Sequence, residues 1–492
     1  MEFAEQLRAS LQQFLAAGAI EIRESTGRVT SATPLSWELR GAASKPLLHL
    51  WSENCNVTRR VLAITAQSDD RLALAVERFG RTKPDRLEIV RLDHTPSSRI
   101  LTREEFCDQL RRILAEQFPD ETVEKISIAA DLEHSLSRVY ARGISHRAAT
   151  QIAFLAVADN ESPGAVDSCL TYALLWLDRA RQTAGHGSLS ALRLILPKGK
   201  SAAIANRLAA LDPRPIIQVF ELDPLRETLE RINPAASGNV TTWLVPRCEA
   251  QLLAERAQSD LAPIVALAPR EIALHPSVQN EEVVLRFLGL PFARWHNGQI
   301  FFGVDAKMKE LSAATHGGLR GLVHKLQIDR SPLASDARWP LYRAQAERWM
   351  QSVVAQDLSR IDLSLDPQHL YEQVFAQAAG QHGILDLLCI NRARRLVILE
   401  LKAGENLDLP LQAADYWSRI RRHQALGDFA RYGYFPGIEL QPAPPLVYLI
   451  APALRFHPTT DALQRYLSPE LEIIRIGLAE SWRRGIRVMF RQ

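Results

Sequence analysis

The feature that most constrains the fold of this chain is an internal repeat of its predicted elements. Residues 102–220 predict a helix, three strands, a helix, a strand, a helix and a strand, and residues 341–476 predict the same order. The central parts align without gaps at an offset of 244 residues, which places Ile152 on Leu396. Repeats decide the architecture before other fold arguments apply. We therefore expect two copies of one α/β unit, although short apolar strands also resemble one another by chance.

The predicted elements divide the chain into four parts. Residues 1–100 predict a helix followed by an antiparallel, β-rich domain, and residues 101–275 predict the first α/β copy. Residues 276–339 predict a linking hairpin and helical segment, with a turn at Asn297-Gly298, and residues 340–492 predict the second copy. The expected fold class is therefore an α/β (α+β) multidomain protein. Its 47% hydrophobic content is typical of globular chains.

Composition and the pattern of apolar residues indicate where the protein is located. The net charge of +3 neither requires nor excludes a nucleic-acid partner. The five cysteines are scattered without a CxxC pair, which is typical of a reduced intracellular compartment. The acidic N-terminus does not resemble a signal peptide, and no apolar run approaches the roughly 20 residues that span a bilayer. We expect a cytoplasmic protein without a membrane partner.

Two apolar strands of the second copy carry charges that a core strand should avoid. Asp386 interrupts the run 383–390, and Glu400 and Lys402 interrupt the run 395–402. Glu400 and Lys402 are two residues apart, so on a strand they project from one face, which Asp386 can meet if the strands pair. Two carboxylates and one ammonium are the minimum set for a hard divalent cation beside a water. The alternative is an ordinary ion pair at a strand end.

The repeat supplies an internal comparison for these charges. At the same offset, Asp386 falls on Arg142, Glu400 on Ala156 and Lys402 on Ala158. The first copy therefore lacks the acidic and lysine groups of the second, and we expect it to be degenerate.

The order of elements, with Asp386 on the second strand and Glu400-Leu-Lys402 on the third, resembles the PD-(D/E)XK nuclease superfamily. Gln412 and Tyr416 share one face of the following helix, and this spacing resembles the RecB-like branch. The part from residue 340 on also resembles NucS-type DNA endonucleases, which join an N-terminal β-rich DNA-binding domain to a C-terminal nuclease core. The resemblance implies two restriction-endonuclease-like αβββαβ units, the first degenerate.

The same resemblance implies roles for individual residues. Asp386, Glu400 and the main-chain carbonyl of Leu401 would hold Mg²⁺ or Mn²⁺, and Lys402 would position the attacking water. Glu347 would assist the metal unless it is a solvated helix carboxylate, and Glu372 is a weaker rival for that role. Gln412 and Tyr416 would orient a phosphate or the lysine, unless they serve only to pack the helix on the sheet.

Three arginines continue the helix after Tyr416. Arg419, Arg421 and Arg422 would follow a DNA backbone, although surface solvation also explains them. The expected function is a Mg²⁺-dependent deoxyribonuclease, an endonuclease of repair or defence, with DNA as its partner. The competing interpretation is a non-catalytic nucleic-acid-binding or scaffold protein on the same fold. The sequence leaves open whether two chains form a homodimer.

Overall fold

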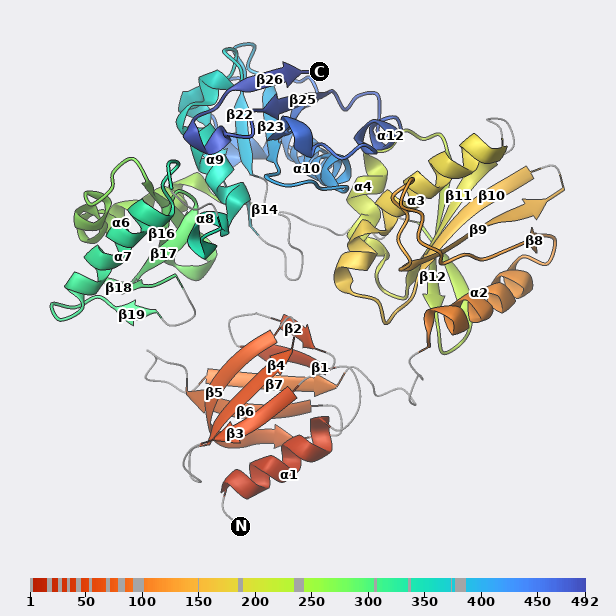
Figure 1. The fold of residues 1–492 in the computed structure, drawn as a ribbon, viewed down its shortest axis with the longest axis horizontal. Coiled ribbons are helices and arrows are strands. Elements are labelled where there is room, and N and C mark those ends of the chain that lie inside the picture. The colour runs from red at the N-terminus through yellow and green to blue at the C-terminus, as the bar shows by residue number, and fades with distance from the viewer. Residues whose placement is uncertain are drawn as a thin grey trace. The chain divides into compact units, whose positions relative to one another are not determined.

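The computed structural model divides the chain into two compact units, Met1–Ile100 and Leu101–Gln492. We describe each unit by itself (Figure 1). The described residues are 3–15, 20–24, 29–32, 36–40, 46–52, 55–67, 71–77, 85–91, 101–148, 150–184, 189–233, 243–304, 308–334, 338–372, 374–376 and 386–492. The boundaries expected after residues 275 and 339 both fall inside the second unit.

The first unit is a seven-stranded sheet with one helix, α1 (Phe3–Leu15). Every pairing is antiparallel, and the strand order is β2-β1-β7-β6-β5-β4-β3. The strands are β1 (Ile20–Glu24), β2 (Val29–Ala32), β3 (Ser36–Arg40), β4 (Leu47–Ser52), β5 (Cys55–Gln67), β6 (Arg71–Glu77) and β7 (Asp85–Arg91). Leu7 and Leu11 of α1 pack on Leu48 and Leu72 of the sheet, which gives this unit its own apolar core.

The second unit begins with a six-stranded sheet and its helices. Helix α2 (Arg103–Gln117) starts at a capping box, in which Thr102 and Glu105 bond each other's main chain. The other elements are β8 (Thr122–Val123), β9 (Tyr140–Arg147), β10 (Thr150–Val157), α3 (Pro163–Ala184), β11 (Leu189–Pro197), α4 (Ala205–Ala209), β12 (Ile216–Asp223) and β13 (Thr228–Ile232). Residues 125–130, between β8 and β9, form no strand and contribute one bridge between Ser127 and Arg142.

The C-terminal part builds a second six-stranded sheet. Its elements are α8 (Pro340–Arg343), α9 (Ala346–Gln356), β20 (Tyr371–Glu372), β22 (Leu387–Ile390), β23 (Leu396–Leu401), α10 (Leu409–Ala425), α11 (Asp428–Arg431), β24 (Leu446–Pro452), α12 (Thr460–Gln464), β25 (Ile473–Leu478) and β26 (Val488–Arg491). Strand β21 (Phe375–Ala376) does not join this sheet and pairs instead with β14 (Trp243–Leu244) as a separate two-stranded sheet. Residues 383–385 of the predicted strand 383–390 lie outside the described part.

The two six-stranded sheets have the same topology. Their strand orders are β13-β12-β11-β10-β9-β8 and β20-β22-β23-β24-β25-β26, which are the same order read from opposite ends. In each sheet the first three strands pair antiparallel, the third, fourth and fifth pair parallel, and the last returns antiparallel. In each, a long helix, α3 or α10, connects the third strand to the fourth. The mixed α/β class is thus confirmed, and both copies share one chain path.

The two copies pack against each other reciprocally. Helix α3 of the first contacts α12 of the second, and α10 of the second contacts α4 of the first. Leu211, after α4, forms a bridge with Leu467, after α12. Around this bridge Asp212 N donates to Tyr466 O over 2.9 Å, and Ser468 N donates to Ala210 O over 2.8 Å. Such matched contacts are typical of an isologous dimer interface, here within one chain.

The register corrects the residue equivalence expected from the gapless alignment. In β10, Leu155 pairs with Arg142 and lies in the core beneath α3, whereas Ala156 faces α2. In β23, Leu399 pairs with Leu387, which places Asp386 opposite Glu400. Glu400 projects, like Ile398, toward α10. Arg142 therefore matches Asp386, as expected. Glu400 and Lys402, however, match Leu155 and Val157. The reason is that the connection between the two paired strands is one residue longer in the second copy than in the first.

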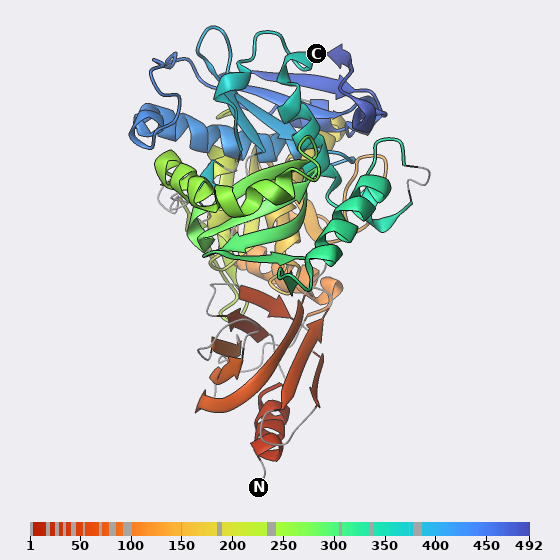
Figure 2. The same ribbon diagram turned by 90° about the vertical axis from the view of Figure 1, so that its left-hand side faces the viewer.

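The segment expected to be a linker, residues 276–339, belongs to a five-stranded antiparallel sheet that begins a few residues earlier (Figure 2). Its strands are β15 (Ile272–Ser277), β16 (Glu282–Phe287), β17 (Leu290–His296), β18 (Gln299–Phe302) and β19 (Lys309–Glu310), with helices α6 (Arg247–Val265) and α7 (His316–Asp329). The Asn297-Gly298 turn is confirmed, with both residues at positive φ. Phe292 and Trp295 share one core with Trp349 of α9 and Leu399 of β23, so this sheet supports one face of the C-terminal sheet.

Candidate active site

Four charged side chains meet where β22 and β23 approach α9. Asp386 precedes β22, Glu400 lies in β23, Lys402 follows it, and Glu347 lies in the first turn of α9. The Leu401 N–H donates to Asp386 Oδ2 over 2.8 Å, which fixes this carboxylate against the neighbouring strand. Lys402 Nζ lies 3.2 Å from Glu400 Oε1 and 3.7 Å from Glu347 Oε2. We call these four side chains the charged cluster.

Glu400 and Lys402 of the charged cluster are largely removed from solvent, whereas Glu347 is exposed. Glu400 is 1% exposed, and the Lys402 side chain is 12% exposed. Burial raises the pKa of Asp386 to about 6, against the lowering effect of Lys402. Burial and then the charge of Asp386 raise the pKa of Glu400 well above its ordinary value. For Lys402, burial alone would lower the pKa, but Glu400, Glu347 and Asp386 together raise it. The ammonium therefore stays charged beside carboxylates that compete for protons.

The donor atoms of the charged cluster fit a hard divalent cation. Glu400 Oε2 is buried and has no hydrogen-bond partner in the described part of the chain, which is costly unless a cation satisfies it. Asp386 supplies a second carboxylate. Within the same described residues, no group of three or more His, Cys, Asp or Glu is placed to hold a metal ion. Two carboxylates and a main-chain carbonyl suit Mg²⁺ or Mn²⁺, which retains several waters, better than a metal enclosed by protein ligands.

The two predicted residues of helix α10 differ in burial. Tyr416 is buried, and burial followed by the charges of Glu400 and Asp386 raises its pKa. Gln412 is half-buried one turn earlier, and its side chain makes no hydrogen bond with the described residues. Packing also accounts for this helix, because Trp417 and Ile420 belong to the core that joins the two copies.

The three predicted DNA-contacting arginines differ in their surroundings. Arg419 is buried, and its guanidinium is held by Asp415 one turn earlier at 2.8 Å, so it is not placed as a surface contact. Arg421 pairs with Glu470 and stacks on the ring of Trp417. Arg422 is exposed.

Gln351 is a site residue that the sequence analysis missed. It is buried in α9, and its Nε2 donates to the main-chain oxygen of Asp386 over 3.1 Å and to Glu372 Oε2 over 3.0 Å. Gln351 thereby holds the end of β22 against α9. The signal was its spacing of four residues from Glu347, which places both on one helix face. Glu372, the rival of Glu347 for the metal, turns instead toward His275, whose Nδ1 lies 3.4 Å away.

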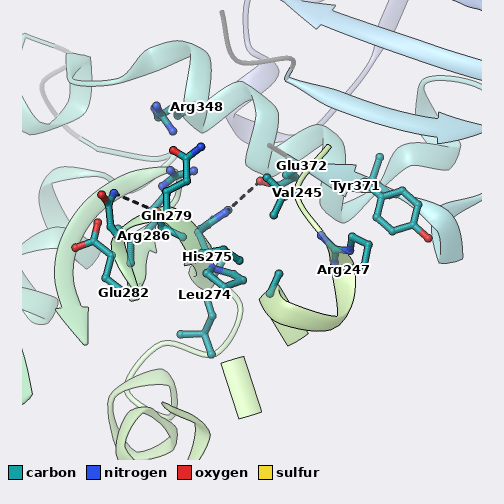
Figure 3. Close-up of a pocket in the computed structure, with 18 residues that line it drawn as sticks. Val245, Arg247, Leu274, His275, Gln279, Glu282, Arg286, Arg348, Tyr371 and Glu372 are labelled. Atoms are coloured by element: carbon teal, nitrogen blue, oxygen red, sulfur yellow. Dashed lines mark hydrogen bonds and ion pairs between the residues drawn. The ribbon is translucent and has the colours of Figure 1, made fainter. Parts of the chain in front are cut away.

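Glu372 and His275 line a pocket of about 430 Å³ beside the charged cluster (Figure 3). The pocket lies between the β15–β16 hairpin, α9 and β20, and its walls carry Arg247, Arg286 and Arg348. No sequence motif marked this pocket, because its residues come from four separate segments.

Comparison with known proteins identifies no relative of this chain. No protein-family model, curated protein or solved structure matches the chain. Among the described residues, no helix has both the length and the apolar character needed to cross a membrane.

Proposed function

We propose that the C-terminal part of this chain, residues 340–492, is a metal-dependent phosphodiester hydrolase that cleaves DNA. The observation that carries the proposal is a pair of carboxylates, the half-buried Asp386 and the buried Glu400, beside Lys402, with Glu400 Oε2 lacking a hydrogen-bond partner among the described residues. A buried group of this kind costs folding free energy, so a chemical role is the better reason for its presence.

The sheet order adds support that does not depend on these residues. A helix, an antiparallel three-stranded meander, a helix and a parallel fourth strand form the arrangement that the resemblance to PD-(D/E)XK nucleases implies. The first copy, with Arg142, Leu155 and Val157 at the matching positions, is then a nuclease-like unit without its charged groups. The fold does not require these charges, because the first copy builds the same sheet without them.

In this proposal each residue of the charged cluster has its own role in hydrolysis. A Mg²⁺ or Mn²⁺ ion held by Asp386, Glu400 and the Leu401 carbonyl would supply Lewis-acid activation of a phosphodiester and a water. Lys402, kept protonated by its carboxylate neighbours, orients that water and offsets negative charge on the phosphorus centre. Glu347 forms an ion pair with Lys402 and attracts the ammonium. The Tyr416 hydroxyl, protonated because its pKa is raised, donates to a phosphate oxygen.

The test is a cleavage assay with labelled single-stranded, duplex, flap and mismatched DNA, with Mg²⁺, Mn²⁺ or EDTA. We expect metal-dependent cleavage by the full chain and its loss, by at least about a hundredfold, in Asp386→Ala and Lys402→Ala. Glu230→Ala, at an exposed carboxylate of β13, is the matched control and should cleave normally. Binding of DNA without cleavage on all substrates would leave the non-catalytic alternative.

A further inference from the structure

The lining of the pocket beside the charged cluster includes three arginines from three elements. Arg286 lies on β16, Arg348 on α9 and Arg247 at the start of α6 (Figure 3). Arg286 and His275 share one face of the β15–β16 hairpin, because alternate residues of paired strands point the same way. Arg286 is 7% exposed, so its charge is held largely away from water.

The positive charges of the pocket act on one another. Burial and then the charge of Arg348 lower the pKa of Arg286 to about 10. Burial, Arg286 and Arg348 lower the pKa of His275 to about 3, so the imidazole is neutral at pH 7. Arg348 has no ion-pair partner within the described residues. Two carboxylates also line the pocket. Glu282 lies 3.8 Å from Arg294 of β17, and Glu372, whose pKa is raised by burial, accepts from Gln351. Three arginines against two carboxylates leave the lining with a formal excess of one positive charge.

The pocket adjoins the charged cluster directly. Gln351 donates from one amide nitrogen to Glu372, in the pocket wall, and to the main chain of Asp386. Arg348 follows Glu347 in α9, and its charge lowers the pKa of both Glu372 and Asp386 against their burial. The pocket wall at Glu372 and the charged cluster at Asp386 are therefore joined by one side chain of α9.

We propose that this pocket binds the terminal phosphate of a DNA strand whose next phosphodiesters lie at the charged cluster. The proposal rests on the proposed function. A terminal phosphate carries a charge of about −1.5 to −2 and three acceptor oxygens, which match several guanidinium groups better than an internal phosphodiester does. The volume of about 430 Å³ lies near the lower end of ligand pockets, which favours one end nucleotide over a strand that passes through.

The test measures binding in EDTA, so that it does not depend on cleavage. Fluorescence anisotropy compares one labelled single-stranded oligonucleotide carrying a 5′-phosphate, a 3′-phosphate or hydroxyls at both ends. We expect one phosphorylated form to bind the full chain about tenfold tighter or more, the amount expected for a charged hydrogen-bonded pair. Arg348→Gln should remove this preference, and Arg320→Gln, at an exposed position of α7, should keep it. Arg348 is half-buried, and a thermal melt verifies that its variant is folded.

Three outcomes would overturn the strand-end assignment. One is equal affinity for phosphorylated and unphosphorylated strands, and another is retention of the preference in Arg348→Gln. The third is competition by a free nucleoside monophosphate as strong as that by the phosphorylated strand, which would assign the pocket to a free nucleotide. The nuclease proposal is tested separately. If the protein prefers a phosphorylated strand but cleaves no substrate, the assignment of the pocket stands and the hydrolase proposal is refuted.

Discussion

If the charged cluster serves chemistry, replacing it by the residues of the first copy should make the protein more stable. The exchange is Glu400→Leu with Lys402→Val, which copies Leu155 and Val157 onto the matching positions of β23. Both residues already fit this face of the sheet in the first copy, where they are buried in the core beneath α3.

The size of the effect follows from what the wild-type protein buries. The Glu400 oxygen without a partner costs about 1–3 kcal/mol. Replacing a buried ion pair with apolar residues of similar volume is usually neutral or stabilising, by up to about 4 kcal/mol. Asp386 keeps its hydrogen bond from Leu401 N–H in the exchanged protein. We therefore expect the free energy of unfolding to rise by about 1–4 kcal/mol.

Urea unfolding followed by tryptophan fluorescence measures this change. Trp349 in α9 and Trp417 in α10 are buried on the two faces of the C-terminal sheet, so they report on the part of the chain that carries the exchange. Glu230→Leu is the control, since an exposed substitution changes stability by less than about 0.5 kcal/mol.

Magnesium supplies a second measurement on the same samples. A ligand that binds only the native state raises the free energy of unfolding by about 2.7 kcal/mol when its concentration is a hundred times its Kd. We expect Mg²⁺ to stabilise the wild-type protein and to leave the exchanged protein unchanged. An exchanged protein that unfolds at lower urea than wild type would refute the reasoning, because the charged cluster would then hold the fold together.

Two further predictions concern groups away from the charged cluster. Burial alone would raise the pKa of Asp362, but hydrogen bonds from Arg491 and Tyr448 outweigh it and hold the pKa well below its usual range. Its contribution is present above the unfolded pKa of about 3.9 and is lost as pH falls. Asp362→Asn should thus cost about 1.5–3 kcal/mol in urea unfolding at pH 7 and less at pH 3. The buried Arg330 bonds main-chain carbonyls at Leu288 and in 341–345, so Arg330→Met should lower stability by about 3 kcal/mol or more in the same assay.

The convergence of Asp386, Glu400 and Lys402 could be predicted because it depends on local rules. Side chains alternate along a strand, and neighbouring apolar strands pair, so three interruptions at the right spacing meet. The match of Glu400 to Ala156 was wrong because a gapless alignment ignores the length of the connection between strands. One residue more between β22 and β23 reverses the face to which every aligned side chain points.

Contacts between distant segments could not be predicted from local pattern. Gln351 meets Asp386 and Glu372 only because α9 packs across the sheet. The five-stranded sheet was interpreted as a linker because its one clear signal, the Asn297-Gly298 turn, identifies a single hairpin. Arg419 looked like a surface residue by type, and its ion pair with Asp415 accounts for its burial.

The reciprocal packing of the two copies leads to a prediction about the product. In an isologous dimer of nuclease units each subunit carries a site, and two sites can cut two strands. Here the first copy takes the position of the second subunit, yet it has Arg142 and Leu155 where the second has Asp386 and Glu400. Arg142 donates to the main-chain oxygens of Ser137 and Tyr140, so its guanidinium serves the local fold.

The described part of the chain therefore contains one charged cluster, and we expect the protein to cut one strand at a time. On supercoiled plasmid DNA at protein concentrations below that of the plasmid, nicked circles should accumulate before any linear product. Linear product that appears at the same rate as nicked circles, independent of protein concentration, would contradict this. Such a result would require two sites in one particle and would mean that the internal pairing of the two copies does not replace a homodimer.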